Sequence, residues 1–135
     1  MANFKALDHF LQVNKFQLLA TSKSENFGDE YNIFSNEELE IKISSTKSDI
    51  IIDVRKRSSG EKWFDLILIK SLIDNHEKFT VSLSVEELST FLKDNFEKIL
   101  DLFKQENYDS TIARLQDLER SRIKQNFPQL FKPDQ

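Results

Sequence analysis

Three short runs in the first half of the chain place apolar residues at every second position. They contain Tyr31 and Ile33, then Leu39, Ile41 and Ile43, then Ile50, Ile52 and Val54. Side chains of a β-strand point alternately to opposite faces, so this period of two predicts strands with one buried face. A fourth apolar run at 16–21 ends in a polar cluster and fits a further strand. We therefore expect a β-meander over residues 16–57.

The connections between these runs are short and polar. Residues 35–37 suit a hairpin connection, and residues 44–49 suit a longer connection between the next two strands. Short connections join antiparallel neighbours, because a parallel pair needs a crossover of a dozen or more residues. Strands that pair in sequence order then form an antiparallel four-stranded meander.

The opposite parity of the same runs predicts the second face of this sheet. Charged residues such as Glu38, Glu40 and Asp53 fall there, as expected for a face in water. Phe34 and Ile51 have the same parity. They require a covering helix, a bulge that changes the parity, or a partner that covers an exposed patch. These five residues are our candidate protein-binding residues.

Helical periodicity surrounds the predicted strands. Apolar residues recur at helical spacing in four segments, 1–14, 65–74, 84–104 and 109–126. Asp65 is a candidate N-cap, and Ser84 with Glu87 forms an S-x-x-E capping box. We expect one α+β domain over residues 1–135, with an N-terminal helix, the meander, and three helices packing on the sheet.

Three further segments have competing interpretations. Trp63 lies beside Phe64 and a predicted helix, so core packing is favoured over a ligand-stacking role. The basic run 55–57 is favoured as a solvated strand end that deters edge pairing, the alternative being a site for a phosphate or an acidic partner. Residues 79–83 fit a short strand.

Composition argues against several classes of function. The net charge of -4 lacks the basic surplus that drives binding to a phosphate backbone, so we expect no nucleic-acid partner. With no cysteine and only His9 and His76, the chain has no zinc motif, and two glycines do not supply a Gly-rich phosphate loop. We therefore assign no catalytic, cofactor-binding or metal-binding residues and expect no cofactor.

The start of the chain and its apolar runs bear on location. Residues 1–5 are not a basic segment followed by an apolar one, so no signal peptide is predicted. The run 66–69 is interrupted by Lys70, well short of the roughly 18 apolar residues that a membrane-spanning helix needs. We expect a cytoplasmic protein with no membrane partner.

Part of the chain resembles a known group of proteins. The residues are Phe27-Gly28-Asp29-Glu30-Tyr31, the strand pair ending in Ile52-Asp53-Val54, and Trp63-Phe64-Asp65-Leu66. Together they resemble a loose group of small bacterial α+β proteins, some of which look like the immunity partners of polymorphic or contact-dependent toxins. The resemblance covers about a third of the chain, residues 27–73. It implies a cytoplasmic, non-enzymatic bacterial protein that binds another protein.

Three functional hypotheses therefore stand. In the first, the chain is a binding module of immunity type, and Glu38, Glu40 and Asp53 meet a basic toxin domain and speed its encounter. In the second, a pocket between sheet and helices binds a small molecule or hosts a minor enzyme activity, using Tyr31, Trp63 or His76. In the third, the chain forms a homodimer through the second face of the sheet or an open edge strand.

Overall fold

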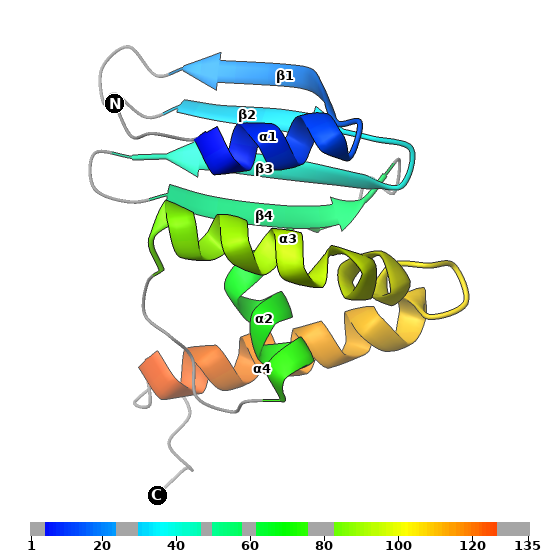
Figure 1. Cartoon of the computed structure of the whole chain (residues 1–135). Helices are drawn as coiled ribbons and strands as arrows, with labels where there is room; N and C mark the ends of the chain where they lie inside the picture. Colours follow the sequence, from blue (N-terminus) through cyan, green and yellow to red (C-terminus); the bar gives the residue numbers. More distant parts are fainter. Residues whose placement is uncertain (1–4, 24–29, 47–49, 58–61, 76–82, 127–135) are drawn as a thin grey trace, which may run out of the picture.

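The computed structural model describes residues 5–23, 30–46, 50–57, 62–75 and 83–126. Helices and strands follow one another along the chain as α1 (Lys5–Val13), β1 (Gln17–Lys23), β2 (Glu30–Ser35), β3 (Leu39–Ser45), β4 (Ile50–Lys56), β5 (Phe64–Asp65), α2 (Leu66–Asp74), α3 (Val85–Leu102) and α4 (Tyr108–Asn126). The strands come together in one sheet, and the helices lie against it and below it (Figure 1). The predicted α+β class and the N-terminal helix are confirmed.

The sheet within the described residues has five strands in the order β1-β2-β3-β4-β5, and every neighbouring pair is antiparallel. The predicted antiparallel meander is confirmed, but its count of four strands is one too few. The additional strand, β5, has only two residues, Phe64–Asp65. Two residues cannot show a period of two, so the sequence pattern contains no signal for it. Most of the strand predicted at 79–83 lies outside the described residues.

The helices are arranged in two tiers rather than one. α1 and α3 pack against each other over the sheet, and α2 contacts β4 and β5. α4 packs mainly on α2, so the expectation that all three later helices pack on the sheet is wrong for α4 (Figure 1). The 18-residue α3 and 19-residue α4 therefore enclose α2 and do not share one plane.

One continuous core lies between the sheet and the helices. The rings of Phe10, Phe16 and Phe96 meet with centroids 5.1–6.1 Å apart and join α1, the start of the sheet and α3. Offset and edge-on aromatic contacts of this kind add stability beyond the area they bury. The fully buried side chains around this cluster include Leu7, Leu39, Ile41, Ile52, Val54, Leu66, Leu68, Ile69, Leu92, Ile99 and Leu115.

Two helix starts are set by local hydrogen bonds. The Asp65 carboxylate accepts the Ile67 backbone N–H at 2.9 Å and caps α2, as predicted. At the start of α3, the Ser84 hydroxyl accepts the Glu87 N–H and the Glu87 carboxylate accepts the Ser84 N–H, both at 3.1 Å. The predicted capping box is therefore confirmed, and both helices begin where short-range chemistry places them.

The register between β2 and β3 overturns one predicted face. Phe34 lies opposite Ile41, and Ile41 lies opposite Val54, so these three share the core side. Phe34 packs against the core, whereas Ile33 lies opposite Lys42 on the other side. The predicted parity is correct for β3 and β4 but wrong for β2. Phe34 therefore lies on the covered face, not with Glu40 and Asp53.

The cause of this difference is the connection at residues 36–38. The Asn36 side-chain oxygen accepts the backbone N–H groups of Glu38 and Leu39, both at 2.8 Å, and the Asn36 N–H donates to the Leu39 carbonyl. This turn pairs Ser35 with Glu40, so even positions in β2 face odd positions in β3. Alternation inside each run is preserved, but the parity of one run does not carry over to the next.

Candidate functional site at the outer face of the sheet

The described helices supply core side chains to the side of the sheet that carries Ile41 and Val54, and they leave the opposite side uncovered. We call this opposite side the outer face. Register places on it Tyr31, Ile33, Glu40, Lys42, Ser44, Ile51, Asp53 and Arg55, with Trp63 and Asp65 at its β5 edge. Tyr31 is 39% exposed and Ile51 is 41% exposed. The outer face thus mixes exposed apolar groups with charges.

One row across the outer face joins an acid, a base and an indole ring. Glu40 on β3 lies opposite Arg55 on β4, and Arg55 Nε is 2.6 Å from Glu40 Oε1. The Arg55 guanidinium carbon lies 4.1 Å from the centre of the Trp63 ring. Glu40 is only 7% exposed, so this ion pair is shielded from water on one side. The guanidinium is therefore held between a carboxylate and an aromatic face, both of which favour its charge.

This geometry corrects the predicted role of Trp63. Trp63 is half-buried on the outer face, and its neighbour Phe64, 2% exposed, is the residue that enters the core. Consecutive side chains of an extended segment point to opposite faces, so only one of two adjacent aromatics can be buried in the core. The core-packing interpretation is wrong for Trp63. The Trp63 ring instead lies on the outer face, with the Lys42 ammonium and the Arg55 guanidinium over it.

A second row carries four charges. Lys42, Asp53 and Asp65 lie opposite one another on β3, β4 and β5. Arg122 of α4 reaches the end of this row, and its Nη1 is 3.1 Å from Asp65 Oδ2. The other Asp65 oxygen caps α2, so both oxygens of this carboxylate have partners. α4 is thereby joined to the rim of the outer face by a contact that spans 57 residues of sequence.

Lys42 and Asp53 face each other across β3 and β4 without forming an ion pair. The Lys42 ammonium is instead 5.1 Å from the centre of the Trp63 ring and 5.8 Å from that of Tyr31. Within the described residues, the Asp53 carboxylate has no hydrogen-bond or ion-pair partner. Among the described residues of the outer face, Lys42 therefore has no carboxylate in direct contact, and Asp53 has no basic group in direct contact.

Burial raises the pKa of Asp53 from 3.8 to about 6, and the neighbouring Asp65 carboxylate adds to this rise. Lys42 and Arg122 act in the opposite direction and lower the pKa, but they do not cancel the cost of burial. A charge taken partly out of water without a partner favours its neutral form. Asp53 is therefore a carboxylate whose charge changes near neutral pH.

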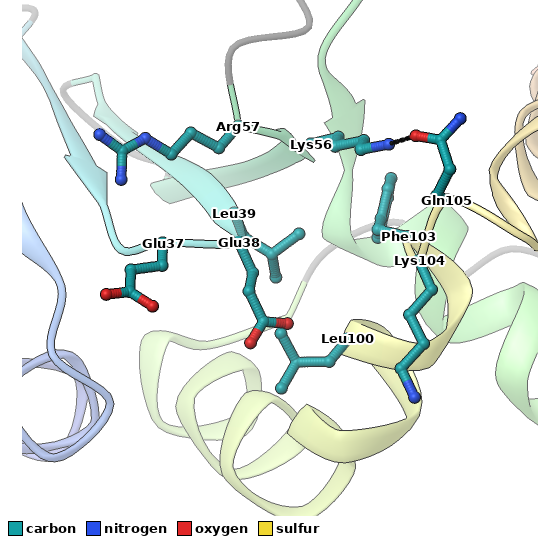
Figure 2. A pocket seen from close by; sticks show the side chains of 9 residues that line it. All are labelled: Glu37, Glu38, Leu39, Lys56, Arg57, Leu100, Phe103, Lys104 and Gln105. Atoms are coloured by element: carbon teal, nitrogen blue, oxygen red, sulfur yellow. Dashed lines mark hydrogen bonds between the residues drawn. The ribbon is translucent and has the colours of Figure 1, made fainter.

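A hollow at one end of the sheet is the second candidate site. It has a volume of about 670 Å³ and lies between the ends of β3 and β4 and the C-terminal end of α3 (Figure 2). Its apolar lining is Leu39, Leu100 and Phe103, and its charged rim includes Glu38 and Lys104. The Asp101 carboxylate, hydrogen-bonded to Lys104, raises the pKa of that amine above its usual value. The hollow is thus lined by apolar groups and ringed by charges.

The basic run 55–57 does not converge on one ligand. Arg55 lies on the outer face against Glu40. Lys56 donates to the Gln105 side chain at 2.6 Å, and Arg57 donates to the Asn36 carbonyl at 3.0 Å. Figure 2 shows the Lys56 and Arg57 side chains pointing in opposite directions. Three adjacent cations with three separate destinations do not form a phosphate cradle.

The structure brings together three of the five predicted site residues. Glu40, Ile51 and Asp53 share the outer face, whereas Glu38 lies at the rim of the hollow and Phe34 lies beneath the sheet. Lys42, Asp65 and Arg122 are not among the residues predicted to form a site, although the parity of β3 places Lys42 on the outer face. Arg55 is named only in the alternative phosphate or acidic-partner site of the basic run, and Trp63 only for a small-molecule site. No local pattern predicts that Arg122 reaches Asp65.

The residues named for a small-molecule site are not gathered in one pocket. Tyr31 and Trp63 both contact Lys42 on the outer face, outside the hollow between sheet and helices. His76 lies outside the described residues. Within the described ranges, no three His, Asp or Glu side chains gather so as to hold a metal ion. None of the helices in those ranges combines the length and apolarity needed to cross a membrane.

Fold and site together define an α+β protein with a one-sided antiparallel sheet and a mixed aromatic and charged outer face. Comparison with protein families, curated proteins and solved structures finds no match for this chain. The geometry and chemistry of the outer face therefore carry the functional argument.

Proposed function

We propose that this chain is a non-enzymatic protein-binding module and that its outer face is the contact surface. The observation that supports this is the side of the sheet left uncovered by the described helices, where Tyr31 and Ile51 are exposed and Trp63 is half-buried. Protein interfaces are enriched in aromatic residues and Arg, which form anchors that bury much area at low entropic cost. The outer face has this composition on a rigid sheet.

The charges of the outer face favour binding over catalysis. Glu40 is paired with Arg55, and Asp65 is paired with Arg122 and caps α2. Acid–base catalysis needs a group free to exchange a proton beside a second polar group that contacts the substrate. Among these acids only Asp53 has no such structural partner, and one carboxylate does not make a catalytic pair. The paired charges instead hold the aromatic and aliphatic groups in place.

The resemblance to immunity proteins suggests a bacterial toxin domain as the partner. A basic toxin was expected to meet Glu38, Glu40 and Asp53. Because Glu40 is neutralised by Arg55, the charge available to steer a basic partner comes from Glu38 and Asp53. We therefore propose that affinity comes from the aromatic groups and that these acids affect mainly the rate of encounter.

The test is a binding measurement by biolayer interferometry with a purified bacterial toxin domain, the kind of partner that the resemblance implies. Trp63→Ala and Ile51→Ser are expected to weaken binding at least tenfold, because each removes an apolar side chain from the outer face. The matched control is Val13→Ser, since Val13 is 62% exposed on α1, away from this face. Equal binding by Trp63→Ala, Ile51→Ser and the wild type would contradict the proposal, provided that circular dichroism shows both variants folded.

A second candidate function rests on the hollow in Figure 2. Its volume of about 670 Å³ and its apolar lining of Leu39, Leu100 and Phe103 are those of a small-molecule site. A thermal-shift screen against metabolites tests this function, because a ligand that binds only the folded state raises Tm. A hit that Leu100→Asp abolishes and Trp63→Ala leaves intact would favour this function over the protein-binding one.

A further inference from the structure

We propose that a second copy of this chain occupies the outer face, in a two-fold dimer that pairs Lys42 of each protomer with the partner's Asp53. This inference rests on the proposed function in one respect, which is that the outer face is an interface. It goes further by naming the occupant and the contacts at the centre of the interface.

Most charges of the outer face are paired inside one protomer. Glu40 pairs with Arg55 and Asp65 pairs with Arg122, so these four groups are satisfied. Lys42 and Asp53 are the remaining charges of the outer face, and they have opposite signs. They lie opposite each other in register but do not pair, because the Lys42 ammonium lies near the rings of Trp63 and Tyr31. One residual cation and one residual anion make the surface complementary to itself.

Lys42 and Asp53 are placed symmetrically about the line midway between β3 and β4. A two-fold dimer uses the same patch on both subunits, so the patch must match its own rotated copy. Consider a two-fold axis between two stacked sheets that runs parallel to the strands, midway between β3 and β4. Rotation about this axis places each β3 residue of one protomer over the residue of the partner's β4 with which it is paired in register. Lys42 then faces the partner's Asp53, and Asp53 faces the partner's Lys42. The same operation brings Glu40 over the partner's Arg55.

Apolar side chains surround these charges on the outer face. Isolated ion pairs at a surface contribute too little free energy to hold two chains together. The same axis sets Ser44 over the partner's Ile51, a small residue against an exposed aliphatic one. Tyr31, Ile51 and Trp63 supply the apolar contact. Two sheets packed face to face with nearly aligned strands are a common arrangement, and this axis keeps the strand directions aligned.

Asp53 lies partly out of water without an ion-pair partner among the described residues. Burial already raises the pKa of Asp53, which shows that water and Lys42 together do not fully stabilise its charge. The groups that face this carboxyl within a protomer are Lys42 on β3, Asp65 on β5 and Arg122 on α4. In the dimer, the partner's Lys42 adds a second cation beside this carboxyl.

Charge reversal tests the pairing directly. Sedimentation equilibrium of the full chain is expected to give a dimer for the wild type. It should give a dimer at least tenfold weaker for Lys42→Asp and for Asp53→Lys, because each places like charges across the axis. An equimolar mixture of the two variants is expected to regain dimer mass, because the new acid of one variant then faces the new base of the other. Recovery on mixing also shows that both variants fold.

Three further variants separate this geometry from others. Lys93→Glu on the exposed side of α3 is the matched charge control and is expected to leave the dimer intact. Ser44→Arg is expected to dissociate the dimer by steric clash with the partner's Ile51. Leu19→Lys lies on β1, an edge of the sheet whose seven residues are all exposed, and should have no effect. Dissociation by Leu19→Lys but not by Ser44→Arg would overturn the face-to-face dimer in favour of edge pairing.

Two other results also overturn the inference. One is a monomeric wild type at millimolar concentration, and the other is a mixture of Lys42→Asp and Asp53→Lys that stays monomeric. A monomeric wild type that binds a toxin domain, with binding lost in Trp63→Ala, would overturn the dimer and leave the proposed function standing. The opposite outcome is a dimer that responds to the charge-reversal variants as expected, together with toxin binding that Trp63→Ala does not change. That outcome would support the dimer and contradict the proposed function.

Discussion

Asp53 and Asp65 lie directly opposite each other on β4 and β5, yet only Asp65 has a basic partner. Arg122 of α4 approaches Asp65 at 3.1 Å, and the second Asp65 oxygen caps α2. Two neighbouring carboxylates therefore differ in their surroundings, and burial together with the Asp65 charge raises the pKa of Asp53 to about 6. Asp65 is thus held by two partners, whereas the charge of Asp53 depends on pH.

The first prediction concerns the stability of the Asp53→Asn variant as a function of pH. The folded pKa of Asp53, about 6, exceeds its ordinary value of 3.8, so the folded state holds this proton more tightly. The contribution of Asp53 to stability is thus fully present below about pH 4 and is lost as pH rises through about 6. At pH 8, Asp53→Asn should be more stable than the wild type by roughly 1–2 kcal/mol, allowing for partial exposure to solvent.

Urea unfolding at pH 4, 6 and 8 measures this difference in the free energy of unfolding. The two proteins should agree at pH 4 and diverge above it. A constant difference over the whole range would show that the amide acts through packing and not through the charge.

The second prediction concerns the contact between α4 and the rim of the outer face. Arg122→Met removes the partner of Asp65 and leaves two carboxylates facing each other on β4 and β5. We expect a loss of roughly 1–2 kcal/mol in the free energy of unfolding at pH 7, and a smaller loss at pH 4 where Asp53 is protonated. Arg120→Met is the matched control. Its pair with Asp117 is exposed and 3.5 Å long, so the expected loss is below about 0.5 kcal/mol. Equal losses for the two variants would contradict the prediction.

The third prediction compares the adjacent aromatics Trp63 and Phe64. Phe64 is buried in the core, so Phe64→Ala should lower the free energy of unfolding by about 3–5 kcal/mol. Trp63 is half-buried and contacts Arg55 and Lys42, so Trp63→Ala should cost only about 1 kcal/mol. In the wild type, acrylamide should quench the Trp63 fluorescence readily. Protection of this fluorescence from acrylamide would contradict the surface position of the ring.

The fourth prediction concerns the capping box of α3. Ser84→Ala removes the acceptor of the Glu87 N–H and should cost about 1 kcal/mol. Glu87→Ala removes the reciprocal acceptor of the Ser84 N–H and should cost somewhat less. Because both side chains close one motif, the double variant should lose less than the sum of the single losses. Strict additivity of the three measured free energies would argue against coupling through the box.

Local patterns in the sequence determined where several elements begin and which residues alternate within them. Ser84, Glu87 and Asp65 act on backbone groups two or three positions away, so a few letters suffice to predict these helix starts. The alternation in β3 and β4 likewise predicts that Glu40 and Asp53 share one face. The caps depend on residues only two or three positions apart in sequence. In β3 and β4, the alternation within each run happens to match the register in which the two strands pair.

Only the tertiary structure decided how these pieces combine. The hydrogen bonds of Asn36 set the register that turns Phe34 toward the core, and a strand shift of one residue would reverse its face. The contact between Arg122 and Asp65 joins residues 57 positions apart, which no periodicity encodes. The outer face is left open because α1, α2 and α3 pack on the other side of the sheet and α4 packs mainly on α2. That choice depends on the summed burial of many side chains, and no single run of residues determines it.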